Sequence, residues 1–110
     1  IGAQAMERIH LRWLTACADG RRVQVRSIAA ERGILHLAGP RARDLLAAAT
    51  PDAVDDAALP FFSLREIEIG MVPAQVVRVS FTGELGYEIH CATDHLRALP
   101  VHVRGVAEPP

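Results

Sequence analysis

Alternation of apolar and polar residues in the second half of the chain constrains the fold most strongly. Residues 65–69, 75–81 and 86–91 place apolar side chains at every second position. This period of two suits a strand with one buried face and does not produce the apolar stripe of a helix. The short segments 70–73 and 82–85 separate the stretches and are rich in turn-forming residues. Strands joined by such short turns are expected to pair antiparallel.

Helical spacing appears earlier in the chain and again near its end. Residues 4–18 repeat apolar side chains at intervals of three and four, and Asp19-Gly20 supplies a stop signal. A second helix is expected from Gly39-Pro40 to Ala49, because proline is tolerated at a first helical position. Asp94 is expected to cap a last helix that starts at His95.

Further strand signals lie between the first two helices. Residues 22–28 alternate, whereas residues 34–38 are apolar enough to lie centrally in a sheet. The order is helix, two strands, helix, three strands, helix. This order predicts an α+β fold, with a mostly antiparallel sheet and helices packed on one face. We expect one domain over residues 4–99 and a disordered tail over 100–110, which is polar and aperiodic.

The composition excludes several classes of function. With 110 residues, a net charge of −1 and no basic stripe, no nucleic-acid partner is expected. No apolar run is long enough to span a bilayer, so no membrane partner is expected. The chain contains no lysine, which excludes a Schiff-base lysine and a P-loop lysine. Its abundance of alanine and arginine is typical of a GC-rich bacterial genome. We expect a fragment of a longer cytoplasmic protein, with Cys17 and Cys91 as small buried residues rather than a disulfide.

The stretch from Arg78 to His90 is the most informative part of the chain for chemistry. Strand periodicity places Glu88 and His90 on one face, and Arg78 and Ser80 on one face of the partner strand. If the register aligns these faces, a carboxylate, an imidazole, a guanidinium and a hydroxyl group converge. The alternative is a solvent-facing ion pair between Arg78 and Glu88 across the strands.

The remaining polar residues do not form a metal site by their spacing. His36 lies within an apolar stretch and is expected to be a core histidine. His90 and His95 lack the spacing of metal ligands. The acidic residues between 52 and 56 are expected to form a surface run rather than a cation site.

Three blocks, in order, resemble the glycine-cleavage T-protein (aminomethyltransferase) superfamily. Residues 34–46 give a strand, Gly-Pro and a helix, and Leu-Pro-Phe-Phe at 59–62 precedes Arg-Glu-Ile-Glu-Ile-Gly at 65–70. The third block, at 78–90, is Arg-Val-Ser-Phe-Thr-Gly-Glu-Leu-Gly-Tyr-Glu-Ile-His. The Gly-Glu-Leu-Gly-aromatic-Glu form of this hairpin is most similar to the folate domain of dimethylglycine and sarcosine dehydrogenases.

This resemblance implies a partial tetrahydrofolate-binding domain of an enzyme that forms 5,10-methylene-tetrahydrofolate, with FAD in a separate domain. It implies that Glu88 contacts the pterin, accepting its 2-amino and N3–H groups. Phe81 stands where the family usually has tyrosine, so stacking is kept and a hydroxyl group is lost. Tyr87 and Arg78 complete the predicted folate-binding set, with Tyr87 either lining the pocket or packing in the core.

The same resemblance places the catalytic aspartate and a further arginine of the family outside this chain. We therefore assign no catalytic residue, and we expect the isolated fragment to be inactive. One alternative is a fragment of a glycine-cleavage aminomethyltransferase. Another is a non-catalytic module that binds folate or contacts a protein, which would favour self-association through exposed strand edges.

Overall fold

The computed structural model describes residues 4–99 and divides the chain into two compact units. One unit ends at Ala30 and the other begins at Glu31. The predicted tail over 100–110 lies outside the described residues. Within residues 4–99, no helix has both the length and the apolar character needed to cross a bilayer.

The first unit contains the predicted N-terminal helix. A short 3-10 helix, η1 (Gln4–Met6), leads into α1 (Glu7–Ala18), which confirms helical structure over this segment. The strand predicted over 22–28 is wrong, because these residues have no regular structure. A strand requires a hydrogen-bonded neighbour, and the sheet of this protein is built entirely from described residues beyond Glu31.

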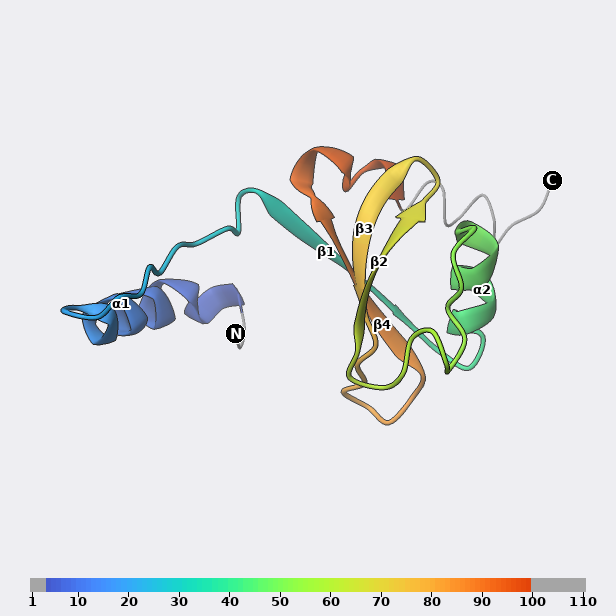
Figure 1. The fold of residues 1–110 in the computed structure, drawn as a ribbon, viewed down its shortest axis with the longest axis horizontal. Helices are drawn as coiled ribbons and strands as arrows, with labels where there is room; N and C mark the ends of the chain where they lie inside the picture. The colour runs from blue at the N-terminus through green and yellow to red at the C-terminus, as the bar shows by residue number, and fades with distance from the viewer. Residues whose placement is uncertain (1–3, 100–110) are drawn as a thin grey trace. The chain divides into compact units, whose positions relative to one another are not determined.

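The second unit is built on an antiparallel sheet of four strands in the order β1-β4-β3-β2 (Figure 1). These strands are β1 (Arg32–Ala38), β2 (Leu64–Ile69), β3 (Val72–Val77) and β4 (Gly86–Ala92). The fold class is therefore the predicted α+β class. β1 pairs with β4 alone in this sheet and lies at its edge, so the central position predicted for residues 34–38 is wrong.

β3 begins and ends earlier than its pattern of alternation predicted. The strand was expected over 75–81, but it starts at Val72 and ends at Val77. The link from β2 is a tight turn in which Gly70 adopts a φ of 64°, a left-handed conformation that glycine adopts without steric cost. Because the turn is this short, pairing of β2 with β3 resumes at once, with Ile69 opposite Val72.

One face of the sheet is covered by helix α2 (Ala42–Ala49) and by the loop that follows it. α2 starts later than predicted, because Ala42 N–H donates to the carbonyl of Gly39 in a turn that includes Pro40. Apolar side chains of the sheet, of α2 and of this loop are buried between the layers. Each large aliphatic side chain so buried contributes about 1.5–3 kcal/mol, so this face holds the unit together. The fully buried side chains include Leu46, Leu59, Ile69, Val76, Tyr87, Ile89, Cys91 and Leu99.

The two thiols differ in environment. Cys91 is buried in the core as predicted, and burial raises the pKa of its thiol, while the nearby Arg32 guanidinium acts in the opposite direction. Cys17 is exposed on α1, so its predicted burial is wrong. Both are free thiols.

The chain after β4 also differs from its sequence-based prediction. Thr93–His95 form a short 3-10 helix, η2, rather than the start of an α-helix. Asp94 lies inside η2, and no side-chain hydrogen bond caps its beginning. The predicted N-cap at Asp94 is therefore wrong.

Candidate functional site

The face of the sheet opposite α2 carries the polar residues of the candidate site. Residues directly opposite one another in paired strands point to the same side. One such row joins His36 of β1, Glu88 of β4 and Val77 of β3. The next row includes His90 of β4 and Gln75 of β3. We call this side the open face of the sheet.

Glu88 and His90 share the open face, as the alternation of β4 predicted. His90 Nε2 lies 3.2 Å from Glu88 Oε1, within hydrogen-bonding range. Each of the two side chains is only 26% exposed. A carboxylate is therefore held in a partly shielded position beside an imidazole.

Phe81 lies in the loop between β3 and β4, and its ring approaches the row that contains Glu88. The side chain is 79% exposed. Its ring meets the ring of His36 edge-to-face, with centroids 6.2 Å apart and planes inclined by 68°. Since His36 is in register with Glu88, the loop brings an exposed aromatic surface to the end of the open face nearest the carboxylate.

Arg78 does not join this group. The register places Val77 opposite Glu88, so Arg78 follows on the alternate side of the chain. Arg78 Nη1 donates to Asp56 Oδ1 at 2.6 Å and to the carbonyl oxygen of Leu59 at 3.1 Å, and its side chain is only 18% exposed. The expected convergence of four groups and the alternative ion pair with Glu88 are therefore both wrong, because the register aligns Val77 rather than Arg78 with Glu88.

Tyr87 points to the covered face and is completely buried in the core. Its hydroxyl oxygen has no hydrogen-bond partner among the residues that the structure describes. Tyr87 therefore packs in the core and does not line a pocket on the open face. Two of the predicted binding residues, Glu88 and Phe81, thus lie at the open face, while Tyr87 and Arg78 lie elsewhere.

The position of His36 differs from the one that the sequence predicted. It was expected in the core, but it is exposed on the open face, between the partly buried Leu35 and Leu37. The surrounding segment is apolar at Ile34 and Ala38 as well, which hides the alternation that an edge strand requires. The alternation could have revealed this, because in a strand Leu35 and Leu37 point to one face and His36 points to the other.

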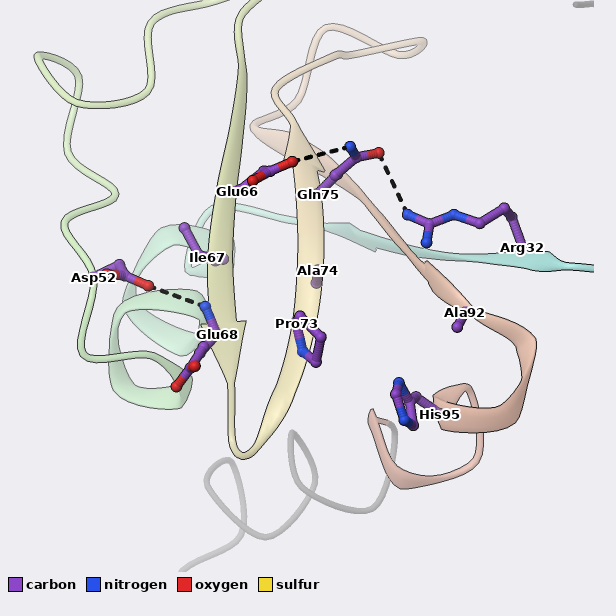
Figure 2. A pocket seen from close by; sticks show the side chains of 10 residues that line it. All are labelled: Arg32, Asp52, Glu66, Ile67, Glu68, Pro73, Ala74, Gln75, Ala92 and His95. Carbon is purple, nitrogen blue, oxygen red and sulfur yellow. Dashed lines mark hydrogen bonds between the residues drawn. The ribbon is translucent and has the colours of Figure 1, made fainter.

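A shallow pocket of about 410 Å³ occupies the other end of the open face (Figure 2). Across it, Arg32 Nη2 donates to Gln75 Oε1, and Gln75 Nε2 donates to Glu66 Oε1, each at 3.4 Å (Figure 2). Asp52 Oδ2 accepts the backbone N–H of Glu68 at 3.0 Å. The polar side chains of Arg32, Gln75 and Glu66 are thus engaged with one another. The whole lining comprises Arg32, Asp52, Glu66, Ile67, Glu68, Pro73, Ala74, Gln75, Ala92 and His95.

The acidic residues Asp55 and Asp56 form hydrogen bonds that stabilise the loop between α2 and β2. Asp55 Oδ1 accepts the N–H of Ala58 at 3.0 Å, and Asp56 Oδ1 accepts Arg43 Nη2 at 2.7 Å as well as Arg78. Within residues 4–99, no group of three or more histidine, cysteine, aspartate or glutamate side chains could hold a metal ion.

Comparison with known proteins places the chain in a family. The family described as the GCVT N-terminal domain matches residues 1–106. Mitochondrial dimethylglycine dehydrogenase of Rattus norvegicus is 35% identical over 91 residues, which are 81% of this chain and 11% of that protein. The aminomethyltransferase of Geobacillus thermodenitrificans is 36% identical over 83 residues, or 74% of this chain and 22% of that protein.

A solved structure gives the same fold. A heterotetrameric sarcosine oxidase from Corynebacterium sp. U-96, in complex with pyrrole 2-carboxylate, superposes with a TM-score of 0.72 at 20% identity. The match covers 87% of this chain and 48% of that chain. The chain thus spans only a small part of its relatives, about a tenth of dimethylglycine dehydrogenase. Since the family match extends over nearly all of its residues, the chain belongs to the GCVT N-terminal domain family.

Proposed function

We propose that this chain supplies part of a tetrahydrofolate site in an enzyme that transfers one-carbon units, with Glu88 as the residue that recognises the pterin. The observation that carries the proposal is the half-buried carboxylate of Glu88 on the open face, in register with His36, whose ring contacts the exposed ring of Phe81. Family membership and the dimethylglycine dehydrogenase and aminomethyltransferase relatives support it.

The residues present fit the pterin in two respects. The 2-amino and N3–H groups of a pterin form an edge with two donors, and a carboxylate can accept both in bidentate fashion. Glu88 Oε1 accepts from His90, but an ionised carboxylate has about four lone-pair sites, so both oxygens remain able to accept. The exposed ring of Phe81 offers an apolar surface on which a planar ring can stack.

Orientation is the task that we assign to these residues. Bound tetrahydrofolate supplies the nitrogen atoms that receive the one-carbon unit. Glu88 would hold one edge of the pterin, and the exposed ring of Phe81 would give its plane a surface to stack on. Holding reactants in place can supply on the order of 7–11 kcal/mol of a barrier in well-oriented systems. No proton transfer is assigned to this chain.

The proposal extends to the longer protein. In that protein we propose a separate flavin domain that oxidises an N-methyl amine such as dimethylglycine or sarcosine, and the dimethylglycine dehydrogenase relatives support this extension. The product formed at the folate site would be 5,10-methylene-tetrahydrofolate. A glycine-cleavage aminomethyltransferase is the second candidate, which the aminomethyltransferase relative favours.

Calorimetric titration with 5-formyl-tetrahydrofolate tests the site. Glu88→Gln keeps the size of the side chain and removes its charge, so affinity should fall by about ten- to a hundredfold, since a hydrogen bond to a charged group is worth about 1.5–3 kcal/mol. Glu66→Gln is the matched control, because Glu66 is an exposed carboxylate on the same face, two strands away. A folded wild-type chain that binds no folate, or a Glu88→Gln variant with unchanged affinity, would refute the assignment.

A further inference from the structure

His90 contacts the carboxylate that the proposed function gives to the pterin. The two residues are two positions apart on β4 and share the open face. His90 Nε2 lies 3.2 Å from Glu88 Oε1, and both side chains are 26% exposed. Because both side chains are partly buried, solvent and salt screen this contact less than they screen a fully exposed pair. We infer that His90 is a positioning residue, which holds the Glu88 carboxylate in the orientation that receives the pterin; this inference rests on the proposed function.

The other neighbours of Glu88 do not perform this role. Val77, opposite Glu88 on β3, has no polar group in its side chain. His36, opposite on β1, turns its ring toward Phe81 and makes no hydrogen bond to the carboxylate. Among residues 4–99, the hydrogen bond to the Glu88 side chain therefore comes from His90.

The chemistry of the contact leaves the carboxylate free to bind a ligand. For Nε2 to donate to Oε1, it must carry a proton, and in the neutral ring Nδ1 is then an acceptor. Oε2 takes no part in the contact with His90, and Oε1 retains a further lone pair. Both oxygens can therefore still accept from the two donors of the pterin edge.

The benefit of the contact is pre-organisation. A free glutamate side chain loses rotamer freedom when a ligand fixes it, and that loss weakens binding. His90 restricts the carboxylate before the ligand arrives, so less freedom remains to be lost. Removing the donor should raise the dissociation constant without changing which groups touch the ligand.

Two substitutions separate this role from a purely structural one. His90→Leu removes the donor, and binding of 5-formyl-tetrahydrofolate should weaken by about three- to tenfold. His90→Gln keeps an N–H donor at nearly the position of Nε2 and should restore most of the affinity. His95→Leu, at an exposed histidine of η2, is the matched control and should bind as the wild type does. Thermal unfolding midpoints compare the folded states of all variants.

A double-mutant cycle then shows whether His90 acts through Glu88. In a Glu88→Gln background, His90→Leu should cause little further loss, because the group that it positions has changed. An equal loss in both backgrounds overturns the inference, as does a His90→Gln variant as weak as His90→Leu. If His90→Leu binds normally while Glu88→Gln does not, this inference fails and the proposed function stands. If the wild-type chain binds no folate, the proposed function fails and the inference falls with it.

Discussion

Gly86 begins β4 and lies against the backbone of the loop before it, which makes its replacement by alanine an informative test of the packing. A Cβ at Gly86 would lie 2.9 Å from the carbonyl oxygen of Val79 and 3.6 Å from His36 Nε2. Real Cβ atoms essentially never approach an atom this closely, so the backbone must move. The loop is held on both sides, because Phe62 N–H donates to the Arg78 carbonyl and Gly39 N–H donates to the Leu85 carbonyl, each at 2.9 Å.

The cost follows from these contacts. Forcing an extra methyl group into a packed site costs about 1–3 kcal/mol, whereas replacing glycine by alanine returns about 0.5–1 kcal/mol through the unfolded chain. Because the obstacle is backbone that hydrogen bonds hold on both sides, the cost should lie in the upper half of its range, and a net loss of about 1–2.5 kcal/mol is expected for Gly86→Ala. For a domain of this size, the unfolding midpoint should fall by about 4–20 °C.

Gly33→Ala is the matched control within β1. Its Cβ would come even closer to another atom, 2.7 Å, but that atom is Cδ2 of Leu96 at the end of a flexible side chain. Leu96 can rotate away, so the loss should stay below about 0.5 kcal/mol. Thermal and urea unfolding, followed by circular dichroism, measure both variants. Equal losses in the two variants, or a Gly86→Ala variant as stable as the wild type, would refute the reasoning.

Further predictions concern buried and bridging polar groups, each checked by urea unfolding. Tyr87→Phe should leave stability unchanged or raise it by up to about 1–2 kcal/mol, since the buried hydroxyl has no partner among the described residues; a loss of more than about 1 kcal/mol would show that the hydroxyl is bonded. Asp56→Ala should cost about 1 kcal/mol, because it removes the carboxylate at 2.6 Å from Arg78, whose side chain is only 18% exposed. Asp44→Ala should cost less than about 0.5 kcal/mol, because its pair with Arg41 is 68% and 86% exposed; equal effects of the two substitutions would contradict this comparison.

The spacing of apolar residues along the chain predicted three elements correctly. β2 and β4 appear where the period of two placed them, and α1 appears within residues 4–18. Residues 22–28 alternate as well, yet they form no strand. A period of two describes a surface that could be half buried, but a strand also needs a partner, and local sequence does not contain that information.

The sequence likewise predicted only those features of the site that depend on a single strand. The shared face of Glu88 and His90 depends only on positions along one strand, so the sequence predicted it correctly. The place of Arg78 depends on the register between β3 and β4, and the place of His36 depends on which strand lies at the edge. Both are consequences of pairing between distant segments, and both predictions were wrong.

By itself, the sequence determined the α+β class, the family and the candidate carboxylate, because these are carried by residue types at fixed local spacing. The tertiary structure alone decided the strand order, the burial of Tyr87 and the pairing of Arg78 with Asp56. The physical reason is that register and layer are set by hydrogen bonds and apolar contacts between segments far apart in the chain. A shift of one residue would exchange the two faces of a strand.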